Sequence, residues 1–221
     1  MLLQPEQLST EEIQELLKRN QKVFNSDVLS ANLLFHSTYI AIFEAFKKDV
    51  ISSILYFFCT DYIEGKVVWS EDYKQNVMDR VGKNRAIDNF CIRTQLMATL
   101  DWLFENNFLT HDEYKKIDEI IEYRNKITHA MAEQIYDERI KPDIQILFKL
   151  YNFWSRISFQ WFVNFELALG IEGLENFEIN YDEYSKFNPF ALVWLYQNFL
   201  SVVKVNDEGF LELKGRNASH E

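Results

Sequence analysis

The sequence predicts an all-α protein, an antiparallel bundle of long helices with a C-terminal helical appendage. Hydrophobic residues make up 48% of the 221 residues and aromatic residues 16%, a composition typical of a packed globular chain. Only 6 glycines and 3 prolines are present, which favours long helices over many short strands. Apolar residues also recur every three or four positions in several long segments, the spacing of a helix with one packed face.

Two helices are expected in the N-terminal third. Ser9 is a suitable N-cap for an acidic first turn, and a helix should follow over about 10–24. The next helix is expected over about 30–64, with apolar residues on two stripes that would bury it on most sides. One face of this helix stays polar and includes Glu44 and Lys48. The segment 64–73 then interrupts the helical pattern and is interpreted as a loop.

The middle of the chain is expected to contain two helices. The first should span about 84–106, with Ile87 and Phe90 in register on its packed face. The second should be capped by Thr110 and continue to about 123, with a packed face formed by Tyr114 and three isoleucines. Both belong to the bundle core, which we place at about 30–169 of a single domain spanning 1–221.

The C-terminal part is expected to contain two more helices. One should run over about 142–169 and end at Gly170. The acidic and aromatic segment 171–187 has no clear period and is interpreted as a connection. Asn188 and Pro189 are suited to open a last helix that reaches about residue 204, and the segment 210–215 is interpreted as a short terminal strand. The C-terminal extension therefore covers about 171–221.

The net charge of the chain and the length of its apolar segments restrict the classes of function that it can have. The net charge of −11 argues against a strongly basic, nonspecific nucleic-acid protein, although it leaves room for a local basic site. The N-terminal stretch lacks the features of a signal peptide, and the uncharged segments 28–43 and 187–203 are shorter than the about 20 apolar residues that span a bilayer. Cys59 and Cys91 have no metal-binding spacing and are expected to be buried thiols. We therefore expect a soluble, cytoplasmic protein without membrane contact.

Several kinds of active site are excluded by spacing. A di-iron helical bundle needs Glu-x-x-His pairs, and none of the four histidines has a glutamate three residues before it. A structural zinc site needs clustered cysteines and histidines, and a phosphate loop needs clustered glycines, and neither cluster occurs. We expect no metal and no cofactor.

The segment EYRNKITHA, residues 122–130, carries the strongest chemical signal. If the helix continues through it, Asn125 and His129 stand four residues apart on one face, with Arg124 on the flank of Asn125. Arginine is suited to bind phosphate oxygens, and histidine can exchange a proton near neutral pH. Together they supply the minimum for cutting RNA without a metal. On chemistry alone, ordinary solvated residues at a helix end remain the stronger alternative.

The helical setting adds a family resemblance. An arginine, four to six residues and then a histidine, with Asn or Asp after the arginine, is the hallmark of the HEPN superfamily, and Arg124, Asn125 and His129 match it with the four-residue spacing. The chain resembles this superfamily over about 30–169. Many members are metal-independent endoribonucleases of toxin–antitoxin, phage-defence and RNA-processing systems, and others are inactive binding modules.

The resemblance implies roles for the residues. His129 would be the general acid and base, Arg124 would stabilise the charged phosphorane, and Asn125 would orient the other two residues or the phosphate. Active members form a homodimer whose two motifs share one cleft, so a second copy, an RNA substrate and an antitoxin protein are the partners it implies. Some toxins carry a Glu-x-x-x-Lys pair on a preceding helix, which Glu44 and Lys48 match.

Other candidates and readings remain open. Arg80, Lys83 and Arg85 could touch an RNA backbone or could be a solvated helix start, and His36 is interpreted as a satisfied core histidine. The aromatic residues of 153–165 could stack bases, but at helical spacing they favour a core or a dimer contact. The rival functions are a non-catalytic HEPN-like binding or scaffold module, which the acidic charge favours, and a structural helical protein with a coincidental motif.

Overall fold

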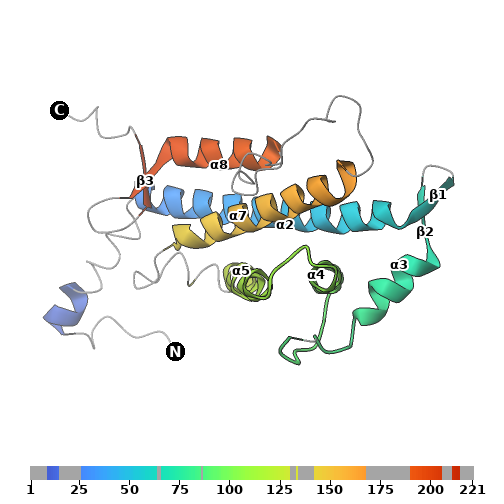
Figure 1. The fold of residues 1–221 in the computed structure, drawn as a ribbon. Helices are drawn as coiled ribbons and strands as arrows, with labels where there is room; N and C mark the ends of the chain where they lie inside the picture. The colour runs from blue at the N-terminus through green and yellow to red at the C-terminus, as the bar shows by residue number, and fades with distance from the viewer. Residues whose placement is uncertain are drawn as a thin grey trace. The chain divides into compact units, whose positions relative to one another are not determined.

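The computed structural model describes residues 9–14, 26–63, 66–85, 87–129, 133, 142–167, 190–205 and 211–214. These residues are mostly helical, which confirms the helical class (Figure 1). The longer helices are α2 (Ser26–Phe57), α4 (Gln95–Glu105), α5 (His111–His129), α7 (Ile144–Trp161) and α8 (Phe190–Val202). Shorter elements are α3 (Glu71–Asn76), the 3-10 turn η2 (Met78–Arg80), the π-helical turn η3 (Phe162–Glu166), and the strands β1 (Cys59–Ile63), β2 (Lys66–Trp69), β3 (Val203–Val205) and β4 (Leu211–Leu213).

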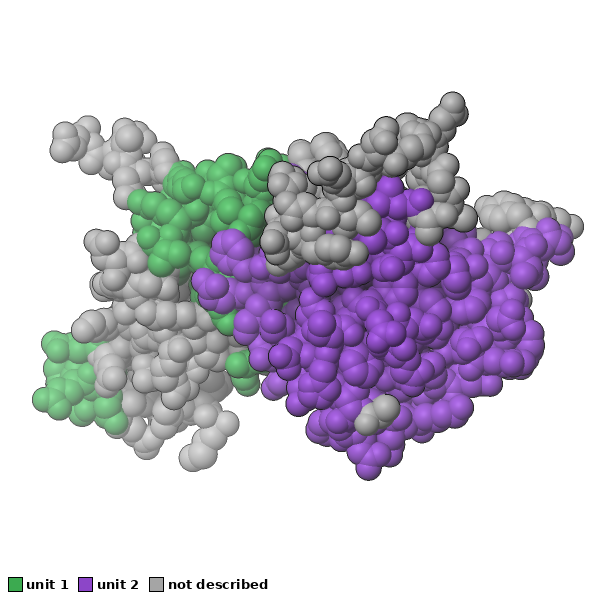
Figure 2. All heavy atoms as spheres, viewed as in Figure 1, with its two compact units in different colours: residues 1–40, 124–144, 194–221 green, residues 41–123, 145–193 purple. Residues whose placement is uncertain are grey.

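The chain divides into two compact units, each assembled from separate segments (Figure 2). Unit 1 comprises residues 1–40, 124–144 and 194–221, and unit 2 comprises residues 41–123 and 145–193. Helices α2 and α5 each contribute to both units, since α2 passes residue 40 and α5 passes residue 123 without a break.

Unit 2 contains two layers of helices. In Figure 1, α2 and α7 run across the view while α4 and α5 are seen nearly end-on, so the two pairs cross steeply. Aromatic side chains join the helices within each pair: Phe46 of α2 lies 6.0 Å from Trp154 of α7, and Phe104 of α4 stacks on Tyr114 of α5 at 5.0 Å, measured between ring centroids. The Trp154 indole also donates to Asp49 at 2.7 Å. The aromatic residues Phe153, Trp154 and Phe159 are buried, as a core role predicts.

Helix α2 ends earlier than expected because the next residues form a hairpin. The predicted helix ran to about residue 64, but β1 pairs antiparallel with β2, with Cys59 opposite Trp69 and Ile63 opposite Lys66. Val67, Val68 and Trp69 have the β-branched and aromatic character that suits a strand. The segment that we interpreted as a loop, 64–73, therefore contains β2 and the start of α3.

The helix predicted over 84–106 is wrong in its first half. Helix α4 begins only at Gln95, where the Thr94 side chain caps it by accepting from the Met97 N–H at 3.2 Å. Before it, residues 77–94 form a loop closed by backbone hydrogen bonds from Gly82 to Ile92 and from Ile92 to Lys83, both 2.8 Å. Phe90, expected on the packed face, is 65% exposed in this loop.

Helix α5 confirms the prediction for its segment and extends it. Thr110 and Glu113 form a capping box: the Glu113 carboxylate accepts from the Thr110 N–H at 2.8 Å, and the Thr110 hydroxyl accepts from the Glu113 N–H at 3.3 Å. Tyr114, Ile117 and Ile120 are buried on its packed face. The helix then continues to His129, six residues beyond the expected end at 123.

Unit 1 contains the start of α2, the end of α5 and most of α8. Phe35 of α2 packs on Phe199 of α8 with ring centroids 5.7 Å apart. Helix α8 ends at Val202, and the chain continues into β3, which pairs with β4 so that Val203 lies opposite Leu213. The strand expected at 210–215 is confirmed, while its pairing with β3 was not foreseen. The expected connection 171–187 and the caps at Gly170, Asn188 and Pro189 lie outside the described residues.

Two other expectations concern burial. Cys59 is half-buried in β1 and Cys91 is exposed in the 77–94 loop, so the prediction of two buried thiols in helices is wrong.

Among the described helices, α2 is long and apolar enough to cross a membrane by length and composition alone. A buried core helix meets the same criterion, and several α2 side chains, including Phe35, Ile42 and Phe46, are fully buried.

Candidate active site at the end of helix α5

The three motif residues lie on the last two turns of α5, within unit 1. Asn125 and His129 are one turn apart and both exposed, as the helical phase predicted. Arg124 is half-buried, because it lies three residues before the buried Ile127 on the packed side of the helix. Its Nη1 donates to the Asn125 side-chain oxygen at 3.3 Å.

The contact between Arg124 and Asn125 brings two of the three motif side chains together. At 3.3 Å it is slightly longer than a typical N–H···O hydrogen bond, and the Nε atom of the same guanidinium is buried. His129 shares the exposed face with Asn125 and is the last helical residue. The arrangement therefore presents a guanidinium, an amide and an imidazole over one short stretch of helix.

Thr128 stabilises the backbone under the motif. Its hydroxyl lies 3.0 Å from the carbonyl oxygens of both Arg124 and Asn125, so it can donate to either. The last turn of a helix has carbonyl groups without helical partners, and a local hydroxyl satisfies part of that need.

The helix end has an electrostatic cost for an anionic ligand. A helix C-terminus carries a partial negative charge that disfavours a nearby anion by about 0.3–1 kcal/mol. Lys126 and His129 in the last turn, together with Arg124, are the side chains that can offset it. A phosphate bound here would therefore depend on these side chains and not on the helix backbone.

Glu44 and Lys48 belong to unit 2, whereas the motif residues belong to unit 1. Glu44 is half-buried and forms an ion pair with Lys47 at 3.2 Å, while Lys48 is exposed. Phe43 and Phe46 are buried, and the Glu44 and Lys47 side chains remain about 40% exposed. An exposed pair of this kind contributes about 0.2–1 kcal/mol, so it has the character of an ordinary surface ion pair.

Two members of the predicted basic cluster are occupied by carboxylates. Arg80 donates to Asp101 at 2.7 Å and to Glu105 at 2.5 Å. Arg85 is fully buried, donates to both oxygens of Asp118 and to Asp88, and lies 5.1 Å above the Tyr114 ring. Lys83 alone is exposed. Arg80 and Arg85 therefore hold the 77–94 loop in place and are not available to contact RNA.

His36 is buried, as expected, but it is not satisfied. Neither of its ring nitrogens has a hydrogen-bond partner within the described part of the chain, and the same holds for the side-chain oxygen of Asn32 one turn earlier. Burial lowers the pKa of His36 below its usual value of 6.5, because desolvation disfavours the charged imidazolium.

No metal site is found among the residues that the structure describes, where no three His, Cys, Asp or Glu side chains gather. Sequence reasoning overlooked a set of cations between α5 and α7, namely Lys116, Lys149 and Arg156. Lys116 of α5 is 33 positions from Lys149 and 40 from Arg156, which are both on α7, so only the packing of α5 on α7 brings Lys116 to the other two.

Comparison with known proteins finds no matching family model, no matching curated sequence and no matching solved structure for this chain.

Proposed function

We propose that the protein is a cytoplasmic, metal-independent endoribonuclease of HEPN type that acts as a homodimer. The observation that supports the proposal is the placement of Arg124, Asn125 and His129 on the last two turns of one helix, with Asn125 and His129 exposed and Arg124 directed toward Asn125. A toxin or phage-defence effector with a neutralising antitoxin is the biological setting that the HEPN resemblance suggests.

The proposed reaction needs only the groups that the motif supplies. The substrate's 2′-oxygen attacks the adjacent phosphorus, a new O–P bond forms, and the bond from phosphorus to the 5′-oxygen breaks. A base takes the proton of the 2′-hydroxyl, and an acid gives a proton to the departing 5′-oxygen. The products are a 2′,3′-cyclic phosphate and a 5′-hydroxyl, and no oxidant, metal or second substrate is consumed.

Two copies of His129 can divide the proton transfers. In a shared cleft, a neutral imidazole of one copy would act as the base and the imidazolium of the other as the acid. Arg124 would face the pentavalent phosphorane, where negative charge increases, and Asn125 would hold its guanidinium. A single chain supplies only one histidine to this reaction, which is why the proposal includes a dimer.

A non-catalytic binding or scaffold module is the second candidate. The net charge of −11 and the negative end of the α5 dipole both oppose binding of a polyanion at the motif. In that case the exposed Asn125 and His129 would contact a partner or a small ligand without cleaving it.

An RNA cleavage assay in EDTA separates the two candidates. The wild-type chain should cut total RNA and leave 2′,3′-cyclic phosphate ends, and His129→Ala should lose activity by about 10²-fold to 10⁴-fold, the usual contribution of a general acid or base. His111→Ala is a matched control, because His111 is exposed at the other end of the same helix. Equal activity of His129→Ala and wild type, with both folded, would rule out the proposed mechanism.

A further inference from the structure

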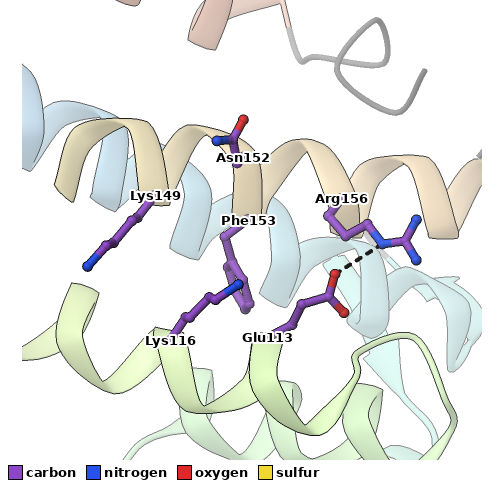
Figure 3. Close-up of a pocket in the computed structure, with 6 residues that line it drawn as sticks. All are labelled: Glu113, Lys116, Lys149, Asn152, Phe153 and Arg156. Atoms are coloured by element: carbon purple, nitrogen blue, oxygen red, sulfur yellow. Dashed lines mark hydrogen bonds and ion pairs between the residues drawn. The ribbon is translucent and has the colours of Figure 1, made fainter. Parts of the chain in front are cut away.

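A cavity lies between α5 and α7 in unit 2 (Figure 3). Its volume is about 310 Å³. Six residues line it, namely Glu113 and Lys116 of α5 and Lys149, Asn152, Phe153 and Arg156 of α7. Lys149 and Phe153 extend from α7 toward α5, and Lys116 and Glu113 extend from α5 toward α7 (Figure 3). The volume falls at the lower end of the range of small-ligand sites.

The cavity is cationic in an otherwise acidic chain. Three basic side chains and a single carboxylate line it, whereas the whole chain carries a net charge of −11. Lys116 is exposed and makes no ion pair or hydrogen bond through its side chain with any described residue. Positively charged side chains that line the same cavity repel each other, and an anion bound between them reduces that repulsion.

The neighbouring residues hold two of the cations in place. Arg156 Nε donates to Glu113 at 3.2 Å. When the Gln160 side-chain oxygen faces the guanidinium, it accepts from Nη2 and Nη1 at 2.9 and 3.2 Å. Lys149 donates to Glu119 at 2.5 Å. Groups that are already fixed lose little conformational freedom when a ligand binds.

We propose that this cavity binds a phosphate group, carried either by a small phosphorylated molecule or by a polynucleotide backbone. A phosphate offers several charged oxygens, so one group can contact Lys116 together with Lys149 or with Arg156, which lie on either side of it in Figure 3, and guanidinium is well matched to its geometry. The Phe153 ring, which is 5% exposed, is the apolar part of the lining. The molecule that bears the phosphate can contact the ring there. Glu113 and Glu119 oppose an anion, but Arg156 and Lys149 partly neutralise them, and Lys116 supplies the additional positive charge.

The proposed phosphate site does not depend on the proposed ribonuclease activity. All six lining residues belong to unit 2, and Arg124, Asn125 and His129 belong to unit 1. Binding can therefore be measured in the His129→Ala chain, in which RNA would stay intact whether or not the wild type cleaves it.

Binding is tested with the full-length His129→Ala chain and three probes. Adenosine 5′-monophosphate represents a small phosphate ester, adenosine is the same molecule without the phosphate, and a fluorescein-labelled RNA 12-mer represents the backbone. Lys116→Gln should weaken binding of a phosphate probe about threefold to fivefold, and Lys116→Gln with Lys149→Gln about tenfold, because each partly exposed cation contributes modestly.

Lys115→Gln is the matched control. Lys115 is exposed on the same helix as Lys116 and does not line the cavity. Its replacement by Gln removes the same positive charge as Lys116→Gln. It should change binding by less than about twofold. Binding of the monophosphate but not adenosine supports a small-molecule source, and binding of the RNA alone supports a polynucleotide source. The site is overturned if the folded chain binds no phosphate probe at millimolar concentration, or if Lys115→Gln weakens binding as much as Lys116→Gln.

Discussion

His36 is buried, and its two ring nitrogens have no hydrogen-bond partner among the residues that the structure describes. It lies on α2 one turn after Asn32, whose side-chain oxygen is also buried without a partner in the described chain. Each buried polar group without a hydrogen bond costs about 1–3 kcal/mol. The packed face of α2 therefore contains a polar pair that lowers the stability of unit 1.

The His36 imidazole is expected to make the fold less stable in acid. The pKa of His36 is lowered in the folded state. Near pH 6.5 the imidazole is therefore protonated in the unfolded chain while it is still neutral in the folded chain. Stability should therefore be fully present above pH 6.5 and fall as the pH drops through that value. Urea unfolding at pH 8 and pH 6 measures the loss, which His36→Leu should reduce.

His111→Gln is the control variant, because it replaces a histidine that is exposed at the start of α5. At pH 8, His36→Leu should be about as stable as the wild type or up to about 1 kcal/mol more stable, since it removes buried polar atoms without partners. An equally steep loss of stability in acid for His36→Leu and the wild type would show that other groups cause it.

At the scale of elements, the 77–94 loop is anchored by arginines, of which Arg85 is the more deeply buried. Arg85 is buried, bonded to Asp88 and Asp118, and covered by the Phe90 and Tyr114 rings. The carboxylate contacts hold the pKa of Arg85 above its usual range, so the side chain stays charged at any ordinary pH. The conformation of the loop thus depends on the positive charge of Arg85. Asp88 of the loop and Asp118 of α5 neutralise this charge.

Arg85→Met should destabilise the protein by about 3 kcal/mol, because it leaves Asp88 and Asp118 without their cation. Lys83→Met removes the same charge from an exposed position of the same loop and should change stability by no more than about 0.5 kcal/mol. Thermal or urea unfolding of both variants measures the difference. Similar stability of the two variants would mean that Arg85 does not anchor the loop.

The sequence predicted elements where the signal is local. The cap at Thr110 and the burial of Tyr114, Ile117 and Ile120 depend on residues three or four apart, and both predictions are confirmed. Phe90 fell into helical register but lies in a loop, because backbone hydrogen bonds from Gly82 and Ile92, together with Arg85, favour a closed turn there. Asp101, Glu105 and Asp118, which bind Arg80 and Arg85, are 21 to 33 residues away from them, so periodicity cannot reveal these contacts.

The candidate site was likewise predictable where it depends on residues close together in the sequence. The alignment of Asn125 with His129 follows from a continuous helix and is confirmed by α5. The partial burial of Arg124 follows from Ile127, three residues later, which lies on the packed side. The cations of the α5–α7 cavity come from two helices that are distant in sequence, so only tertiary packing discloses them.

At the scale of the whole molecule, the proposed activity requires two chains. If one active site needs His129 from each copy, activity per chain should fall about tenfold for each tenfold dilution well below the dimer dissociation constant. Cleavage rates over a dilution series, with sedimentation velocity at the same concentrations, measure this relation. A constant activity per chain at concentrations where the protein sediments as a monomer would contradict a shared active site.

The interleaving of the two units has a consequence for how the chain can be divided. Unit 1 is built from three segments and unit 2 from two, and α2 and α5 cross the boundary as continuous helices. No single cut yields two fragments that each contain one whole unit. A continuous fragment that contains all of unit 1 is therefore the whole chain, so Arg124, Asn125 and His129 cannot be expressed in an isolated unit 1.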